Sequence, residues 1–257
     1  MSKVYDMNAD KLSVEIYSSR EEMGNWAAKA VAERIKALLL NQPEVNMIFA
    51  AAPSQNEFLQ ALILDKSISW EKINAFHMDE YIGLVPDAPQ GFGNFLRSKI
   101  FGRVPFKSIN YLCGTVKDIA KECERYTELL RSHPVDIVCM GIGENGHIAF
   151  NDPHVALFDD IVSVKIVELA EKCRAQQIND GCFEEIGKVP THAITLTIPA
   201  LSAGKYIFCM VPGKTKAEAV YKTVSGPVEE ACPASILKTH DHAVLYTDKE
   251  SAKLIFK

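Results

Sequence analysis

The sequence has no long apolar run, no excess of positive charge and no apolar segment near its start. A membrane-spanning helix requires about 20 apolar residues in a row, so we expect no membrane partner. Lys and Arg number 28 against 33 for Asp and Glu, a formal net charge of −5, which argues against a general nucleic-acid-binding surface. Because residues 1–10 lack the apolar core of a secretory signal, we expect a cytoplasmic protein.

The sequence also lacks a Cys-x-x-Cys pair, and its seven cysteines are an odd number. Cys139 and Cys209 lie inside apolar runs, where a free thiol packs as a small hydrophobic group. These features favour reduced thiols over a disulfide framework. His240 and His242 form the only close pair of histidines, and they fit a polar turn better than a metal site, so we predict no metal.

Apolar runs of strand length alternate with amphipathic segments of helix length along the chain. The predicted strands are 46–52, 73–78, 109–112, 136–140, 162–167, 193–198, 205–211 and 243–247. Helices are predicted after Ser19 and Ser54, each the first residue of a Ser-x-x-Glu capping box, and at 93–101, 117–131 and 214–224. This alternation predicts an α/β fold with a mostly parallel, doubly wound (Rossmann-like) sheet and helices on both faces.

No linker rich in Gly or Ser and no internal repeat divides the chain, so we predict a single domain over residues 1–257. Residues 79–93 form a loop rich in Pro and Gly, long enough to indicate a functional role. Residues 153–188 have the least regular pattern and could form a lid over a site.

The segment 141–152, Gly-Ile-Gly-Glu-Asn-Gly-His-Ile-Ala-Phe-Asn-Asp, carries the strongest chemical signal and follows a predicted buried strand. His147 normally titrates near neutral pH, so it suits proton transfer. Asn145 and Asp152 lie close to it in the sequence, and the carboxylate could orient and charge the imidazole. The alternative is an ordinary strand-to-helix turn with a solvent-facing histidine, because glycine-rich turns of this kind are common.

Asp79 follows a second predicted strand, 73–78. The carboxyl ends of parallel strands form the ligand-binding edge of such sheets, so we expect Asp79 to lie near His147 and to form an acid–base pair with it. The alternative for Asp79 and Glu80 is the solvated start of a loop.

Together, the segment 78–84, Met-Asp-Glu-Tyr-Ile-Gly-Leu, and the segment 141–153 resemble the glucosamine-6-phosphate deaminase (isomerase) family. The resemblance covers most of the chain, from about residue 14 to residue 250, and includes 189–195 and 213–219. The related 6-phosphogluconolactonases share the fold and a Gly-His turn but lack the Asp-Glu-Tyr segment and the His-Ile-Ala-Phe-Asn continuation.

The resemblance implies roles for four residues. It makes His147 the acid–base group that opens the sugar ring, tuned by Asn145 and Asp152, and it makes Asp79 the base that moves a proton from C2 to C1. Asp152 stands where relatives usually have glutamate, one methylene longer, which puts its reach to His147 in question. Burial should raise the pKa of Asp79 if it does this work.

The resemblance is weaker at the expected phosphate loop. Relatives usually carry a Thr-Gly-Gly-Thr-Pro type of turn, and this chain has Ala-Ala-Pro-Ser-Gln at 51–55. Ala52, Ser54 and Gln55 remain candidates for substrate binding, because a helix that begins there can bind an anion. The alternative is a plain helix cap.

Two cations could contribute to the same subsite. Lys216 matches the family's phosphate-contacting lysine. Arg174 matches an earlier arginine of the 153–188 segment, and the later one, before Phe183, is missing. Arg174 and Lys238 could compensate for it, although for both a solvated surface charge is the commoner situation.

The resemblance implies an enzyme of hydrolase, isomerase and deaminase chemistry that converts glucosamine- or galactosamine-6-phosphate to a ketose phosphate and ammonia. Its partner would be a small sugar phosphate, without nucleic acid, and the reaction requires no redox cofactor or metal. A 6-phosphogluconolactonase-type hydrolase, which would not need Asp79, and a non-catalytic sugar-phosphate-binding protein stay as alternatives. The sequence leaves a homo-oligomer open.

Overall fold

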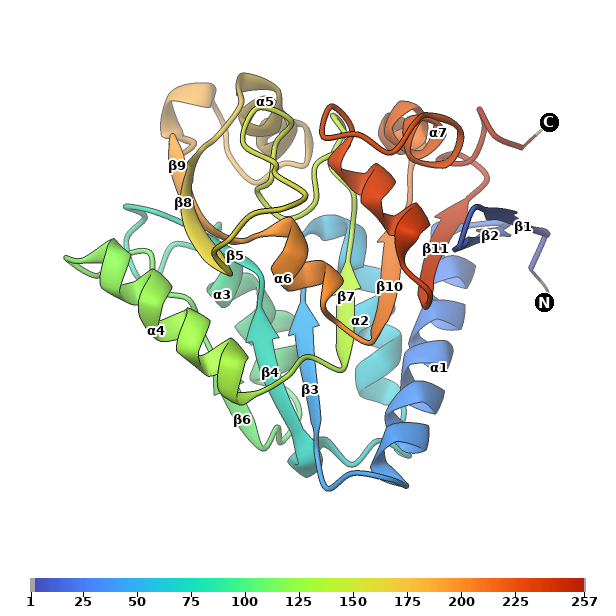
Figure 1. Ribbon diagram of the computed structural model, residues 1–257, viewed down its shortest axis with the longest axis horizontal. Coiled ribbons are helices and arrows are strands. Elements are labelled where there is room, and N and C mark those ends of the chain that lie inside the picture. The colour runs from blue at the N-terminus through green and yellow to red at the C-terminus, as the bar shows by residue number, and fades with distance from the viewer. Residues whose placement is uncertain (1–2, 257) are drawn as a thin grey trace.

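A computed structural model of the chain describes residues 3–256, and its centre is a twisted sheet of eight strands (Figure 1). The strand order is β1-β2-β11-β10-β7-β3-β4-β6. In chain order these strands are β1 (Tyr5–Ala9), β2 (Leu12–Tyr17), β3 (Val45–Phe49), β4 (Ile73–His77), β6 (Ser108–Asn110), β7 (Ile137–Met140), β10 (Tyr206–Val211) and β11 (Ala243–Asp248). All neighbouring pairs are parallel except β1 with β2, which form an antiparallel hairpin at one edge.

The strand order reverses direction between β3 and β7. The chain moves outward from β3 to β4 and β6, returns to β7 beside β3, and then moves the other way to β10 and β11. In open α/β sheets ligands bind at such a point, outside the carboxyl ends of the strands. The loops that follow β3 and β7 therefore lie where a binding site is expected.

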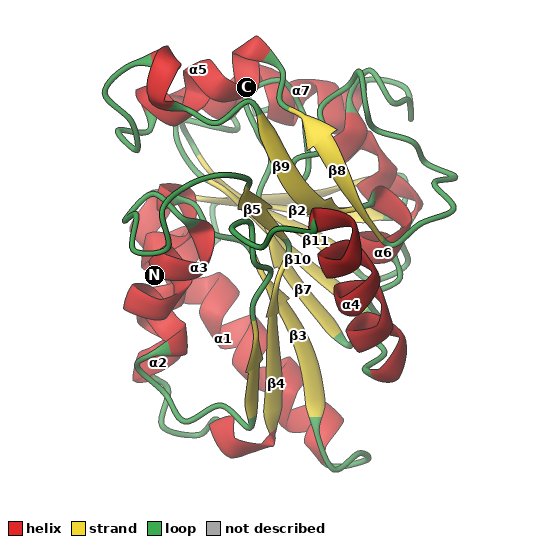
Figure 2. Ribbon diagram, turned by 90° about the vertical axis from the view of Figure 1, so that its left-hand side faces the viewer, coloured by secondary structure: helices red, strands yellow, loops and turns green. Residues whose placement is uncertain are grey.

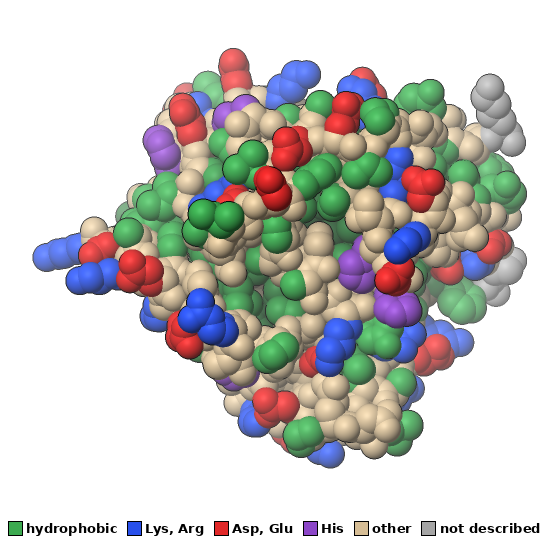
Figure 3. All heavy atoms as spheres, viewed as in Figure 1, with side chains coloured by type: hydrophobic (Ala, Val, Ile, Leu, Met, Phe, Trp, Pro, Cys, Tyr) green, Lys and Arg blue, Asp and Glu red, His purple; other side chains and the backbone are tan. Residues whose placement is uncertain are grey.

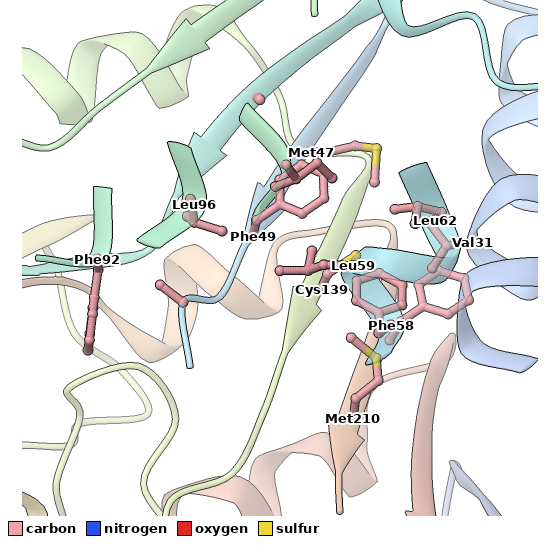
Figure 4. Close-up of a cluster of buried hydrophobic side chains, with 14 of the residues drawn as sticks. Val31, Met47, Phe49, Phe58, Leu59, Leu62, Phe92, Leu96, Cys139 and Met210 are labelled. Carbon is pink, nitrogen blue, oxygen red and sulfur yellow. The ribbon is translucent and has the colours of Figure 1, made fainter. Parts of the chain in front are cut away.

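Helices cover both faces of the sheet, and successive residues of each buried strand point into two separate cores. In β10, Phe208 and Met210 enter the core that contains residues of α1 (Arg20–Leu39), α2 (Asn56–Leu64) and α3 (Phe92–Leu96). Ile207, Cys209 and Val211 enter the other core, with residues of α4 (Ile119–Ser132), α6 (Ile198–Ser202) and α7 (Ala217–Ser225). Figure 4 shows the first core, where Met210 of β10 lies near Phe58 of α2, and Phe49 lies beside Met47, its neighbour on β3. This arrangement confirms the predicted doubly wound α/β fold.

A second, antiparallel sheet of three strands stands beyond the carboxyl edge of the main sheet (Figure 2). Its order is β5 (Asp79–Tyr81), β9 (His192–Leu196) and β8 (Val164–Glu168). A further helix, α5 (Glu171–Asn179), follows β8. The segment 153–188 therefore contains the predicted strand and, in addition, a helix that its sequence pattern did not indicate.

The start of α2 lies close to the carboxyl edge because α1 packs tightly against it. A Cβ added to Gly24 would lie 2.7 Å from the Cβ of Glu57, so only glycine permits this approach of the two helices. Arg20 at the start of α1 pairs with Glu57 through both its Nε and a terminal nitrogen, at 2.7 and 2.9 Å. These contacts fix the end of α2 that borders the site.

One local prediction is wrong, whereas the strands predicted at 162–167 and 193–198 are confirmed. Ser54 is not a helix cap: Pro53 begins a 3₁₀ turn, α2 begins only at Asn56, and no side chain caps it. Residues 162–167 and 193–198 contribute strands to the small antiparallel sheet instead of the main sheet. The β1–β2 hairpin was not predicted. The other capping box is confirmed, because Ser19 Oγ accepts the amide hydrogen of Glu22 at 3.2 Å.

Over residues 3–256, no helix combines the length and apolar character needed to cross a membrane. All seven cysteines are free thiols, and Cys139, Cys173, Cys209 and Cys232 are buried.

Candidate active site

A pocket opens at the carboxyl edge of the main sheet, where the strand order reverses. It is bordered by the loops after β3, β4, β7 and β10 and by α5. Its polar lining side chains are Ser54, Gln55, Asp79, His147, Gln176, Gln177, Asp180 and Lys216. Residues from distant parts of the sequence therefore meet in one concave site, as is typical of ligand sites in this class of fold.

His147 is held from one side by two neighbours. Its Nδ1 lies 2.7 Å from Asn145 Oδ1 and 3.1 Å from Asp152 Oδ1, and both of these atoms are acceptors. Nδ1 therefore carries a hydrogen that the two oxygens share, which leaves Nε2 unprotonated in the neutral ring. Because His147 lines the pocket, Nε2 is the nitrogen available to take a proton from a ligand.

Asp152 reaches His147 because the chain between them folds into a tight turn. Asn151 donates its side-chain amide to the carbonyls of Ile148 and Leu196, at 2.9 and 2.8 Å. Ala149 at the turn has a φ of 51°, a left-handed conformation that is costly for alanine and must be held by such contacts. The shorter aspartate side chain is thus sufficient at this position.

The carboxylate of Asp152 is completely buried and fully hydrogen-bonded. It accepts from Asn145 Nδ2 at 2.8 Å and from the backbone N–H of Ala170 at 2.9 Å, in addition to its contact with His147. Burial acts to raise its pKa, but the hydrogen bonds from His147, Asn145 and Ala170 outweigh burial and hold the pKa below its ordinary value. Asp152 is therefore a permanent negative charge behind the imidazole.

Gly143 is required by the position of the imidazole. A Cβ at residue 143 would lie 2.1 to 2.4 Å from three atoms of the His147 ring. Any larger residue would push the ring away from Asn145 and Asp152. This close approach explains why glycine stands at this point of the motif.

Asp79 lies in the same pocket on β5, and it is 6% exposed. Burial raises its pKa well above the ordinary value of 3.8, and the nearby charge of Glu80 acts in the same direction. Glu80 itself accepts the backbone N–H groups of Tyr81, Phe92 and Gly93, which fixes the start of α3. A buried carboxyl of this kind has the properties of a general base that works near neutral pH.

Gln55 also lines the pocket and is 1% exposed. Its Nε2 donates to the carbonyl of Met210 at 3.2 Å and faces the carbonyl of Met140 at 3.5 Å. The two carbonyls fix the orientation of the amide. The buried Oε1 has no hydrogen-bond donor among the described residues.

Lys216 is 5% exposed and follows β10 in a short 3₁₀ turn. Within residues 3–256, no carboxylate lies within ion-pair distance of its ammonium. Burial lowers the pKa of this amine, and the charges of Asp180 and Glu144 act to raise it. A buried ammonium without an ion-pair partner, beside an open pocket, is suited to donate hydrogen bonds to an acceptor atom of a ligand.

The structure brings most of the sequence-predicted residues together. Ala52, Ser54, Gln55 and Lys216 line the pocket with Asp79 and His147, and Asn145 and Asp152 stand directly behind the imidazole. Arg174 does not belong to this group. Its guanidinium donates to the carbonyls of Ile186 and Val189, which directs it into the turn after α5 instead of the pocket. Lys238 is also elsewhere, because it donates to the carbonyl of Gly226.

Three polar lining residues were missed by sequence reasoning: Gln176, Gln177 and Asp180. They come from α5 and its carboxyl end, inside the segment predicted as a lid. The adjacent pair Gln176-Gln177 in a segment of low overall hydrophobicity is the sequence signal that could have indicated them.

The ligand atoms of His147, Asp152 and Cys173 lie within 4.8 Å of one another and are of types that bind metals. Both oxygens of Asp152 already accept hydrogen bonds from the protein. Burial also raises the pKa of the Cys173 thiol well above its ordinary value, and thiolate is the form that binds a metal. The cluster therefore fits a hydrogen-bonded support for His147 better than a metal site.

Comparison with known proteins places this geometry in a family. The profile described as glucosamine-6-phosphate isomerases/6-phosphogluconolactonase matches residues 18–246. A glucosamine-6-phosphate deaminase of Listeria monocytogenes is 34% identical over 212 residues, covering 82% of this chain and 88% of the relative. One from Bacillus cytotoxicus is 31% identical over 243 residues, 95% of this chain and 89% of the relative.

Solved structures give the same result. A monomeric glucosamine-6-phosphate deaminase superposes with a TM-score of 0.84 at 31% identity, over 94% of this chain and 99% of its own. A 6-phosphogluconolactonase from Thermotoga maritima superposes with a TM-score of 0.75 at 19% identity, over 93% of this chain and all of its own, which supports the fold alone.

These comparisons correct one expectation from the sequence. Hydrolase was included among the main reaction classes, but relatives at 31–34% identity over most of the chain are named deaminases, and the family profile is described first as an isomerase. The classes isomerase and deaminase keep their support, and hydrolase does not.

Proposed function

The chain belongs to the glucosamine-6-phosphate isomerase/6-phosphogluconolactonase family, and from this premise we propose that it is an amino-sugar phosphate isomerase/deaminase. Its substrate is a hexosamine 6-phosphate, and its products are a ketose phosphate and ammonia. The observation that carries the proposal is the pairing in one pocket of a buried carboxyl, Asp79, with an imidazole whose Nδ1 is fixed by Asn145 and Asp152.

Ring opening is the first task in this proposal. Nε2 of His147 takes the proton of the anomeric hydroxyl and returns it to the ring oxygen. The imidazolium that forms is stabilised by the buried charge of Asp152, 3.1 Å from Nδ1. Asn145 bridges the two groups and keeps the ring in one orientation.

Isomerisation is the second task, and it falls to Asp79. Its carboxylate removes the proton from C2, the C1 carbonyl oxygen takes a proton from the substrate's own ammonium group, and an enolamine forms. The same carboxyl then delivers a proton to C1 on the same face, which gives a ketimine that water hydrolyses to the ketose and ammonia. A raised pKa suits this role, because a carboxyl that accepts and releases a proton in turn works best near the operating pH.

The phosphate would lie between the first turn of α2 and Lys216. Ser54 and Gln55 stand at the start of that helix, where free N–H groups and the helix dipole favour an anion. The Lys216 ammonium, which lines the same pocket, supplies a point charge. Arg174 has no part in this arrangement.

We further propose a cytoplasmic enzyme without a nucleic-acid partner, and a segment 153–188 that acts as a lid over the pocket. Figure 3 shows acidic and basic side chains interspersed over one face of the molecule, and this mixture, with the net charge of −5, supports the absence of a nucleic-acid partner. The pocket contacts of Gln176, Gln177 and Asp180 support the assignment of a lid.

The proposal is tested by measuring ammonia and ketose formation from glucosamine-6-phosphate and galactosamine-6-phosphate. One ammonia released for each ketose is the expected result for one of the two epimers. Ketose formation without ammonia, or ammonia from neither sugar, contradicts the proposal.

A further inference from the structure

Gln55, Asp180 and Lys216 line the same pocket, and we infer that this group of side chains, called the distal end below, also accepts an uncharged 6-hydroxyl group. The enzyme then deaminates unphosphorylated hexosamines in addition to the 6-phosphates. The inference rests on the proposed deaminase function and extends its substrate class. It is carried by the hydrogen-bonding capacity of these three side chains.

Gln55 offers an acceptor that a phosphate dianion cannot use. Its Nε2 is committed to the carbonyl of Met210, so the amide cannot turn around without bringing two oxygens together. Its Oε1 is buried and lacks a donor among the described residues. A buried acceptor without a donor costs free energy, so a ligand that donates a hydrogen bond to this oxygen would bind more tightly. A sugar hydroxyl supplies one, whereas the oxygens of a phosphate dianion are all acceptors.

Asp180 adds a second acceptor in the same lining. It receives one hydrogen bond, from Gln176 Nε2 at 3.2 Å, which leaves further capacity on its oxygens. A carboxylate that lines a pocket repels a phosphate dianion and accepts from a hydroxyl. Asp180 therefore favours the same ligand group as Gln55.

The formal charge at the distal end also favours a hydroxyl group over a phosphate. Among residues 3–256, Lys216 is the one lysine or arginine that lines the pocket, and the charges of Asp180 and Glu144 act on it. These three side chains carry a formal charge of −1, from one cation and two carboxylates. A phosphate dianion would bring the local charge to −3, while a hydroxyl would leave it at −1 and could still accept a hydrogen bond from the ammonium.

The adjacent turn at 51–53 offers few hydrogen-bond donors that could offset the repulsion between a phosphate and the carboxylates. Ala51 and Ala52 carry no polar side-chain atoms, and Pro53 has no backbone N–H to donate. The turn before α2 therefore gives a phosphate fewer donors than a glycine-rich loop would. Together, these features lower the advantage that a phosphate gains over a hydroxyl in this subsite.

The experiment compares glucosamine and galactosamine with their 6-phosphates, by ammonia release and by calorimetric binding of the open-chain analogue 2-amino-2-deoxyglucitol with and without a 6-phosphate. We expect kcat/KM for the preferred unphosphorylated sugar within about tenfold of its 6-phosphate, because opposing carboxylates offset most of the charge–charge gain from Lys216. The two analogues should bind with a similarly small difference.

Asp180→Asn tests the cause. It removes one charge and keeps the shape, so the preference for the phosphorylated sugar should increase by about tenfold. Asp159→Asn is the matched control, because it removes an exposed carboxylate from the same 153–188 segment outside the pocket, and it should leave the preference unchanged.

Two results overturn the inference and are distinct from failure of the proposed function. The first is turnover of the 6-phosphate with the unphosphorylated sugar slower by about a thousandfold or more, or an equally large gap in analogue binding. The second is an Asp180→Asn preference equal to that of the wild type. Failure of the proposed function has a different signature, because neither form of the sugar would then release ammonia.

Discussion

The two ends of the pocket differ in how completely their polar groups are satisfied. At the catalytic end, Asn145, His147 and Asp152 bond to one another, and the backbone N–H of Ala170 completes the set. At the distal end, Gln55 Oε1 has no donor among the described residues and Lys216 has no ion-pair partner within residues 3–256. The imidazole and its support are arranged before a ligand arrives, whereas the distal end is completed by the ligand.

This difference indicates that the catalytic end carries out the reaction and that the distal end selects the ligand. Preorganised hydrogen bonds hold reacting groups in place at no cost during the reaction. Unpaired groups at a pocket wall instead select a ligand, because a ligand that fails to pair them leaves them buried and unsatisfied. Substitutions at the catalytic end should therefore change kcat, and those at the distal end should change KM.

The largest effect is expected for Asp79→Asn. The amide keeps the shape of the side chain but cannot take the C2 proton, so kcat should fall by roughly 10²- to 10⁴-fold or more, with little change in the affinity for an open-chain analogue. Steady-state ammonia release and calorimetry measure the two quantities. Near-normal turnover would show that another group shuttles the proton.

Gly143→Ala comes next and tests the preorganisation of His147. The new methyl group would displace the imidazole, so kcat should fall by about 10²-fold, the range of a lost acid–base group. Gly187→Ala is the matched control, because Gly187 has a negative or extended φ and nothing within 4 Å of an added Cβ. If Gly143→Ala and Gly187→Ala have the same kcat, the close packing of residue 143 against the His147 ring does not contribute to catalysis.

Lys216→Ala tests the distal end. A hydrogen bond to a charged group contributes about 1.5–3 kcal/mol, so KM for the hexosamine 6-phosphate should rise by about 10- to 150-fold with kcat largely kept. The change should be much smaller for the unphosphorylated sugar. The exposed neighbour provides the control variant Lys214→Ala, which should leave both values unchanged. An equal response of the two sugars to Lys216→Ala would remove Lys216 from phosphate binding.

The smallest effect concerns stability. The pKa of Asp79 is raised on folding above 3.8, so the wild type loses stability relative to Asp79→Asn as the pH rises through the raised pKa. At neutral pH the variant should gain about 1–2 kcal/mol in the free energy of unfolding, as expected when a strained functional group is removed. Below about pH 3.8 the gain should vanish. Urea unfolding across this range measures it, and a gain that does not depend on pH would contradict the account.

The sequence predicted the main sheet well because its strands are buried on both faces. Runs such as 73–78 and 136–140 are mostly apolar, their strands are buried throughout, and they are followed by the chemistry-bearing residues, so both the strand and its carboxyl end could be located. The parallel order then follows from the alternation with helices. The candidate groups Asp79 and His147 could be placed at one edge for the same reason.

The parts that were not predicted depend on long-range contacts. The 3₁₀ turn at Pro53 replaces the capping box expected at Ser54, and Gln55 is fixed by the carbonyls of Met140 and Met210, which lie on two other strands. Arg174 is directed away from the pocket by backbone carbonyls whose positions no local pattern reveals. Hydrogen bonds between distant segments set these side chains, and sequence spacing does not encode them.

The most direct test of the central claim follows an isotope through the catalytic end. A hexosamine 6-phosphate deuterated at C2 is converted in ordinary water, and the ketose product and ammonia are analysed together by NMR and enzymatic assay. We expect part of the deuterium to move to one face of C1, with one ammonia released per ketose, and we expect Asp79→Asn to abolish both signals. Deuterium distributed over both faces of C1, or transfer that persists in Asp79→Asn, would contradict the assignment of Asp79 as the single proton shuttle.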